Sequence, residues 1–141
     1  MVAYAASADE APSAPIVAGA LAAGKPLLWP RVTRAHGIEI AAAAAHELRR
    51  DASGMLAPPQ SAPPEALREE DLLLVPGVAF TREGARLGRG GGHYDRLLAA
   101  SRGTSIGLAF DVQLVDDLPL EPHDRGVDLV VTPMGLWRRA R

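Results

Sequence analysis

Apolar residues occur along this chain in short runs, separated by polar stretches or by stretches rich in glycine and proline. The most apolar run, residues 71–75, holds three consecutive leucines before a valine, a composition typical of a strand that is covered on both faces. Further short runs predict strands at residues 2–6, 26–30, 37–40, 104–110 and 127–132. Strands are therefore expected at intervals along most of the chain.

Helical patterns lie between some of these runs. After Ser13, a suitable N-cap, apolar residues recur at helical spacing until Gly24 ends the pattern. A second helix is predicted at residues 94–101, before Gly103. Residues 41–50 are rich in alanine and other helix formers, so they are also expected to be helical. Single helical turns are expected at residues 63–70 and 112–115, and a long proline-rich loop at residues 51–64.

The alternation of strands and helices predicts the fold class. Residues 2–6, the helix after Ser13 and residues 26–30 would form a βαβ unit, which places parallel strands in one sheet. We therefore expect an α/β protein with a three-layer α/β/α arrangement around a mostly parallel sheet. Neither a repeat nor a clear boundary divides the sequence, so residues 1–141 are expected to form a single domain.

Composition narrows the class of protein. A hydrophobic content of 48% suits a globular domain, and a formal net charge of -2 does not suggest a nucleic-acid-binding protein, which usually carries a strong basic excess. The chain has no cysteine, so it has neither a disulfide framework nor a thiolate metal site. It also lacks a run apolar enough to span a membrane and the pattern of a secretory signal. A cytoplasmic monomer that binds neither nucleic acid nor membranes is therefore expected.

The glycine-rich stretch at residues 76–96 carries the clearest chemical signal. Six glycines and three arginines lie between the strand at residues 71–75 and the helix at residues 94–101. Glycine lets backbone N–H groups turn toward an anion, and the start of a helix adds positive potential. Arg86 and Arg89 flank the glycines and can donate to phosphate oxygens. The stretch matches neither the G-x-x-x-x-G-K-[ST] loop nor the dinucleotide fingerprint, so a flexible surface loop with solvated arginines is the alternative.

Acidic residues and a histidine near this stretch suggest further roles. Asp95 lies in the first turn of the predicted helix, where it complements the helix dipole or, together with Asp124, binds a magnesium ion beside a phosphate. His93 can act as a general acid or base, or can line the pocket. Glu10 follows the first expected strand, where α/β proteins collect ligand-binding residues, unless it is a solvated loop acid. These residues favour a phosphate site at the carboxyl edge of the sheet.

The chain resembles the 5-formyltetrahydrofolate cyclo-ligase family (methenyltetrahydrofolate synthetases) in a long signature. That signature reads Val75-Pro-Gly-Val-Ala-Phe80, then Gly84-Ala-Arg86-Leu-Gly-Arg-Gly-Gly-Gly-His-Tyr-Asp95-Arg96. It is similar to the family pattern P-G-x-A-F-D-x-x-G-x-R-L-G-x-G-x-G-Y-Y-D-R. The resemblance continues at residues 2–10, 24–31 and 118–133, so it covers nearly the whole chain.

The resemblance implies ATP- and Mg²⁺-dependent cyclisation of 5-formyltetrahydrofolate to 5,10-methenyltetrahydrofolate, with release of ADP and phosphate. Asp95 and Asp124 would bind Mg²⁺, and Arg89 and His93 would be catalytic. The nucleotide site would comprise Arg86, Leu87, Gly88, Arg89, Gly90, Gly91, Gly92, His93 and Tyr94. The folate substrate would contact Glu10, Arg89, Gly90, Gly91, Gly92 and His93.

Departures from the family pattern bear on these expectations. Thr81 stands where the family usually has aspartate, which affects one loop contact. His93 replaces the first tyrosine of the Tyr-Tyr-Asp signature, so one wall of the pocket becomes titratable. Family members also carry a basic helical segment before the first strand, which adds cations to the ATP site and is missing from this sequence. The alternative is therefore a truncated, weakly active or inactive homologue that acts as a folate- or nucleotide-binding module.

Overall fold

The computed structural model of the chain describes residues 1–35, 37–51 and 54–140. Most strands belong to one sheet, and in chain order they are β1 (Leu28–Val32), β2 (Ile38–Ala42), β5 (Pro64–Glu65), β6 (Leu72–Val75), β9 (Thr104–Leu108), β10 (Leu129–Thr132) and β11 (Gly135–Arg138). They form two hydrogen-bonded groups, β11-β10-β9-β6 and β1-β2-β5. Val2 joins the groups, because it bridges in parallel both to Leu73 of β6 and to Leu28 of β1.

The strand directions make this sheet mixed. β6, β9 and β10 run parallel to one another, and the Val2 bridges continue the parallel arrangement to β1. β11 is antiparallel to β10, and β2 is antiparallel to both β1 and β5. The sheet is therefore partly parallel, and the parallel order that the sequence predicts is confined to its middle.

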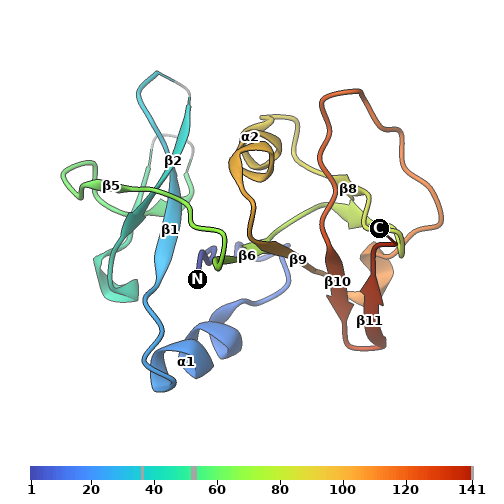
Figure 1. The fold of residues 1–141 in the computed structure, drawn as a ribbon, viewed down its shortest axis with the longest axis horizontal. Helices are drawn as coiled ribbons and strands as arrows, with labels where there is room; N and C mark the ends of the chain where they lie inside the picture. Colours follow the sequence, from blue (N-terminus) through green and yellow to red (C-terminus); the bar gives the residue numbers. More distant parts are fainter. Residues whose placement is uncertain (36, 52–53, 141) are drawn as a thin grey trace.

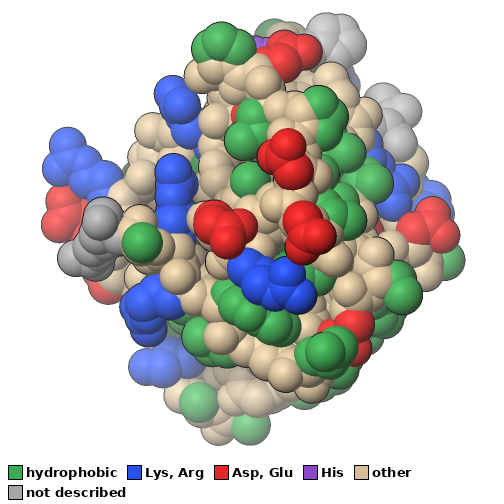
Figure 2. All heavy atoms as spheres, turned by 90° about the vertical axis from the view of Figure 1, so that its right-hand side faces the viewer, with side chains coloured by type: hydrophobic (Ala, Val, Ile, Leu, Met, Phe, Trp, Pro, Cys, Tyr) green, Lys and Arg blue, Asp and Glu red, His purple; other side chains and the backbone are tan. Residues whose placement is uncertain are grey.

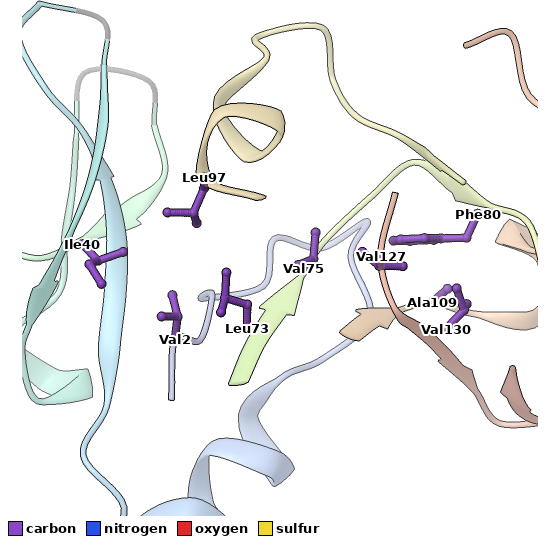
Figure 3. Packing of buried hydrophobic residues seen from close by; sticks show 9 residues of the cluster. All are labelled: Val2, Ile40, Leu73, Val75, Phe80, Leu97, Ala109, Val127 and Val130. Carbon is purple, nitrogen blue, oxygen red and sulfur yellow. The ribbon is translucent and has the colours of Figure 1, made fainter. Parts of the chain in front are cut away.

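One short helix packs against each face of the sheet (Figure 1). The helices are α1 (Ala14–Ala22) and α2 (His93–Ala100). Leu73 and Leu74 are consecutive in β6, so their side chains point to opposite faces. Leu73 shares a core cluster with Leu97 of α2 (Figure 3), whereas Leu74 shares another cluster with Val17 of α1. Two short helices do not make two full helical layers, so the expected three-layer architecture is not confirmed.

Several elements agree with the sequence patterns to within a few residues. The helix after Ser13 is α1, the helix at residues 94–101 is α2, and the runs near residues 26–30, 71–75, 104–110 and 127–132 are β1, β6, β9 and β10. Residues 37–40 lie almost entirely in β2. The strand expected at residues 2–6 is only the bridge at Val2. Ser13 precedes α1, but its hydroxyl donates to the Tyr4 carbonyl instead of capping the helix.

The helix expected at residues 41–50 is wrong. The segment instead continues β2, forms a 3-10 turn at Ala45–Glu47 and enters the short pair β3 (Arg49–Arg50) and β4 (Leu56–Ala57). Ala41 is fully buried opposite Trp29 of β1. Strand pairing and burial therefore outweigh the helix propensity of alanine here.

The structure also differs from the predicted helical turns and the predicted loop. The helical turn predicted at residues 63–70 is wrong, because Pro64–Glu65 extend as β5 against β2. The turn predicted at residues 112–115 is a 3-10 turn at Asp111–Gln113. The proline-rich loop predicted at residues 51–64 contains β4, while its residues 52 and 53 lie outside the described residues.

The outer surface adds two observations. No helix within residues 1–35, 37–51 and 54–140 is both long enough and apolar enough to cross a membrane. Figure 2 shows the face on the side of β11, where acidic and basic side chains lie beside one another. Charges of both signs are thus intermixed on this face.

Candidate functional site

A pocket of about 440 Å³ lies beside the glycine-rich stretch. Its lining falls into three groups. The glycine side comprises Pro76, Gly77 and residues between 86 and 95, and the acidic loop comprises residues between 4 and 10. The apolar side comprises Pro30, Met55 and Leu56, with Arg50 and Gly54 next to them. The pocket lies beyond the carboxyl end of β6, as the sequence predicts for a ligand site on a parallel sheet.

The first half of the glycine-rich stretch is an ordered hairpin. β7 (Ala79–Phe80) pairs with β8 (Arg86–Leu87). Gly84, in the turn, has a φ of +86°, and a Cβ there would lie 2.3 Å from the Val127 carbonyl oxygen. Thr81 is buried, and its hydroxyl accepts a hydrogen bond from the Ala85 amide at 3.3 Å. Thr81 therefore stabilises the turn at the position where the family usually has aspartate.

The second half opens α2 and needs glycine for backbone reasons. Gly90 and Gly92 have φ of +86° and +62°, a conformation that other L residues rarely adopt. Gly92 is the N-cap of α2, so the first N–H groups of the helix face the end of the loop without intrahelical partners. His93 begins the helix, and its Nδ1 lies 2.8 Å from Nη2 of Arg96. This part of the stretch has the backbone geometry that anion binding requires.

Arg86 points inward and is almost fully buried, at 4% exposure. Its Nη2 donates to Oδ1 of Asp95 at 2.9 Å, and its Nη1 donates to the Pro76 carbonyl at 3.3 Å. Its guanidinium carbon lies 5.8 Å from the centre of the Tyr94 ring. Its Nε is buried without a hydrogen-bond partner among the described residues. The ion pair with Asp95 was not foreseen, and a phosphate contact by Arg86 stays a prediction.

Asp95 is the best-anchored acid of the site. Its Oδ1 accepts hydrogen bonds from Arg86 and, at 3.0 Å, from the Arg125 amide. Burial by itself raises the pKa of this carboxyl, but the Arg125 amide and the Arg86 charge outweigh burial, so the pKa lies below its ordinary value. Asp95 is therefore ionised at neutral pH, as a magnesium ligand must be.

Asp124, the second predicted metal ligand, lies in a turn that approaches the start of α2. Its Oδ2 accepts a hydrogen bond from the Glu121 amide at 2.7 Å. Its neighbour Arg125 donates its amide to Asp95, which brings the turn next to the start of α2. Within the described part of the chain, three or more His, Asp or Glu side chains nowhere cluster closely enough to hold a metal by themselves. Mg²⁺ usually takes one or two carboxylates and completes its coordination with water and substrate phosphates, so binding by Asp95 and Asp124 stays a prediction.

Arg89 connects the glycine side to the acidic loop. Its Nη2 donates to Oγ of Ser7 at 3.1 Å and lies 3.8 Å from Oε1 of Glu10 and 3.9 Å from Oδ2 of Asp9. Arg89 is 59% exposed, whereas Glu10 is 16% exposed and accepts a hydrogen bond from the Ser7 amide at 2.8 Å. The fold thus brings together Arg89 and Glu10, two predicted site residues that are far apart in the sequence.

Tyr4 and Tyr94 lie close to the Glu10 carboxylate. Burial, followed by the charge of Glu10, raises the pKa of Tyr4 above its usual range. The same two causes, in the same order, raise the pKa of Tyr94. Both phenols therefore remain protonated at neutral pH. The Tyr4 hydroxyl donates to the Ala11 carbonyl at 2.5 Å.

The predicted residues do not all reach the pocket. Glu10, Arg86, Gly88, Arg89, Gly91, Gly92, His93, Tyr94 and Asp95 line it. Among the described residues of the prediction, Leu87, Gly90 and Asp124 do not. The apolar side was not predicted from the sequence, although the length of the proline-rich loop is a known signal of functional loops. Met55 and Leu56 could not be identified, because no charge or glycine pattern distinguishes them.

Known proteins share both the sequence and the fold. Residues 1–133 match the 5-formyltetrahydrofolate cyclo-ligase family. A 5-formyltetrahydrofolate cyclo-ligase of Mycolicibacterium smegmatis (strain ATCC 700084 / mc(2)155) is 47% identical over 78 residues, which cover 54% of this chain and 40% of the relative. One of Escherichia coli (strain K12) is 46% identical over 70 residues, which cover 48% of this chain and 38% of the relative.

A solved structure extends the similarity to nearly the whole chain. The NMR structure of Aquifex aeolicus 5,10-methenyltetrahydrofolate synthetase has a TM-score of 0.80 and 32% identity, over 97% of this chain and 70% of that one. The family match also includes the whole glycine-rich stretch and the acidic loop that meet at the pocket. On these grounds, the chain belongs to the 5-formyltetrahydrofolate cyclo-ligase family.

Proposed function

We propose that this chain catalyses the ATP- and Mg²⁺-dependent cyclisation of 5-formyltetrahydrofolate to 5,10-methenyltetrahydrofolate, releasing ADP and phosphate. The observation that supports it most directly is the convergence of Glu10, Arg89 and the ionised Asp95 on one pocket. A folate needs an acceptor for its ring N–H groups, and a nucleotide needs cations and a metal site. Glu10, Arg89 and Asp95 all line this pocket, which supports placing the folate and the nucleotide together there.

The phosphates would bind at the glycine side. The N–H groups at the start of α2 and the exposed guanidinium of Arg89 would donate to their oxygens. Asp95 and Asp124 would hold Mg²⁺, which neutralises the negative charge that accumulates on the phosphates during transfer. Arg86 would keep the Asp95 carboxylate ionised and in place through their 2.9 Å contact.

The folate would bind between the acidic loop and the apolar side. Glu10 is mostly buried and anionic, so it can accept hydrogen bonds from the pterin N–H groups. Met55, Leu56 and Pro30 offer an apolar surface to the flat rings. The formyl group would then face Arg89 and His93, at the boundary between the two halves of the pocket.

The proposed chemistry has two steps. The formyl oxygen attacks the γ-phosphorus of ATP, and ADP leaves. N10 then attacks the activated formyl carbon and gives up its proton to the departing phosphate or to water, and the bond between the formyl carbon and the phosphorylated oxygen breaks to release phosphate. The protein contributes by holding the reactants in line and by stabilising the charge on oxygen, rather than by forming a covalent bond. Arg89, exposed at the pocket, would stabilise that charge.

A direct assay tests this function. Mixing the protein with 5-formyltetrahydrofolate and Mg-ATP should produce the absorbance of the methenyl product, and omission of Mg²⁺ or ATP should prevent it. A folded protein that forms no methenyl product under any of these conditions would overturn the proposal.

A second candidate is a binding module that retains folate or nucleotide affinity without turnover. Two observations support this candidate: Arg86 forms an ion pair with Asp95, and Arg89 lies near Glu10 and Asp9. The charges of both arginines are therefore already partly neutralised. Saturable binding of Mg-ATP and of 5-formyltetrahydrofolate, without product, would favour this candidate. For either function we propose a cytoplasmic monomer.

A further inference from the structure

A buried arginine lies behind the apolar side of the pocket. Arg31, in the middle of β1, is only 2% exposed. Glu39 is its cross-strand partner in β2, with Oε1 lying 2.6 Å from Nη2 and 2.7 Å from Nε of Arg31. This pair neutralises the charge of Arg31 but does not use all its donors.

The remaining donors of Arg31 bind the backbone of the proline-rich segment. Nη1 donates to the Pro59 carbonyl at 2.5 Å, and Nη2 donates to the Ala62 carbonyl at 2.8 Å. The Ala62 amide in turn donates to the Pro59 carbonyl at 3.0 Å, so these two acceptors belong to one closed turn. Arg31 therefore fastens the turn at residues 59–62 to β1.

The same segment forms the pocket a few residues earlier. Met55 and Leu56 line the cavity together with Pro30, the residue that precedes Arg31. Leu56 pairs with Arg50, and Arg50 donates to the Gly54 carbonyl at 2.6 Å, but both contacts lie within the proline-rich segment and its own hairpin. The contacts of Arg31 with Pro59 and Ala62, by contrast, cross to β1. Gln60 adds a weaker crossing contact, from Nε2 to the Val32 carbonyl at 3.4 Å.

We propose that Arg31 is a positioning residue that holds the segment of residues 54–62 against β1, so that Met55 and Leu56 form a fixed wall for the folate rings. The identity of the ligand rests on the proposed function, whereas the role in holding the wall does not. A planar guanidinium suits this role because it donates in fixed directions to a carboxylate and two carbonyls at once. Lysine has a single ammonium and cannot reproduce that geometry.

The test combines ligand affinity with the behaviour of the free protein. In Arg31→Met, amide hydrogen exchange in peptides covering residues 54–62 should accelerate, while exchange at residues 86–95 should stay as in the wild type. The Kd of 5-formyltetrahydrofolate should rise about tenfold, because misplacing a wall weakens the contacts it makes. The Kd of Mg-ATP should change by less than about twofold, since its expected contacts lie on the glycine side.

Companion variants separate positioning from general stability. Arg31→Lys should restore part of the folate affinity that Arg31→Met loses. The urea midpoint of Arg31→Met shows whether that variant binds weakly merely because it unfolds. Arg102→Met is the matched control, because Arg102 makes an exposed pair with Glu69 at 3.1 Å away from the pocket. A purely structural role of Arg31 would lower the active fraction and kcat but leave the KM for folate unchanged.

The possible failures are distinguishable. If wild-type protein shows no methenyl formation, the proposed function fails, and the exchange measurements still report on the wall. If exchange at residues 54–62 and folate affinity in folded Arg31→Met both equal those of the wild type, the positioning role is wrong. Equal weakening of folate and Mg-ATP binding would also overturn it.

Discussion

The glycine side and the apolar side of the pocket are built in different ways. On the glycine side, Arg86 contacts residues that are close in the sequence, since Asp95 is nine positions away and Pro76 is ten. On the apolar side, Arg31 reaches Pro59 and Ala62, which lie 28 and 31 positions away. The first side offers charged groups and the N-terminal end of α2, and the second offers hydrocarbon surface.

Because of this difference, we expect the two sides of the pocket to contribute to ligand binding in different ways. Charged groups on the glycine side are held by directional hydrogen bonds and ion pairs, both within the loop and to the acidic loop and the Arg125 amide. An apolar wall has no directional bonds to its ligand, so its value depends on being held at the right distance. Variants of the two sides should therefore affect different ligands and different kinetic constants.

The largest effect is expected from Asp95→Asn. The change removes the charge that we propose binds Mg²⁺ and leaves the buried Arg86 without its counter-charge, so turnover should fall at least about 100-fold. Initial rates of methenyl formation over a range of Mg²⁺ concentrations measure this loss. Asp116→Asn is the control, because that carboxylate is 99% exposed in its pair with Arg82. Turnover within twofold of the wild type would remove Asp95 from the metal site.

Gly84→Ala should cause the next largest change, in stability rather than in chemistry. The new Cβ would lie 2.3 Å from the Val127 carbonyl oxygen in a backbone with φ of +86°. We expect a loss of about 2–4 kcal/mol of unfolding free energy, measured by urea denaturation. Gly19→Ala in α1, where a Cβ meets nothing within 4 Å, should instead stabilise by about 0.5–1 kcal/mol. A neutral Gly84→Ala would show that the hairpin moves freely against residue 127.

Arg89→Met tests the charged side without disturbing the core, because Arg89 is 59% exposed. Loss of this donor should lower kcat/KM for Mg-ATP about tenfold and leave the Kd of 5-formyltetrahydrofolate nearly unchanged. Arg82→Met provides an exposed arginine outside the pocket for comparison. A larger effect on folate binding than on ATP would place Arg89 on the folate half of the site.

Met55→Ala tests the apolar side on a smaller scale. Truncating this side chain should raise the Kd of 5-formyltetrahydrofolate about threefold, because hydrocarbon contact with the rings is lost. Mg-ATP affinity should not change. Met134→Ala, at a methionine that is 76% exposed and outside the pocket, should leave both affinities as they are. If Met55→Ala weakened only ATP binding, the two sides would have to exchange roles.

The smallest effect is a pH dependence on the glycine side. Because the pKa of Asp95 is lowered in the folded state, its ionised form contributes stability that is fully present above the ordinary value of 3.8. That contribution is lost as the pH falls through the lower, folded-state pKa. The difference in unfolding free energy between the wild type and Asp95→Asn should therefore shrink at acidic pH, in urea titrations at several pH values. A difference that grew on acidification would mean that the pKa of Asp95 is raised, not lowered.

The local elements around the glycine side could be predicted from the sequence more fully than the long-range contacts of the apolar side. The order of strand, glycine-rich stretch and helix around residues 71–101 agrees with the structure because each element depends on neighbouring residues. Asp95 could be singled out for the same reason. The hairpin of β7 and β8 inside the stretch was missed, although its turn needs the glycine at position 84.

Long-range contacts could not be predicted. The alanine-rich residues 41–50 have the local preference of a helix, and pairing with β1 and β5 makes their first residues a strand. No pattern shows that Arg31 turns inward to Glu39 and the proline-rich turn, or that Arg89 crosses the pocket to Glu10. Each of these contacts joins segments that approach one another only after the sheet has formed.

The sequence by itself therefore determined the family signature, the local elements around it and the residue types of the glycine side. The tertiary structure alone decided that Val2 joins two groups of strands, that Arg86 is buried on Asp95, and that an apolar wall faces the glycines. The physical reason is the distance along the sequence over which each interaction acts. Glycine torsions, helix starts and alternating patterns act over a few residues, whereas burial and strand pairing depend on segments that the sequence keeps apart.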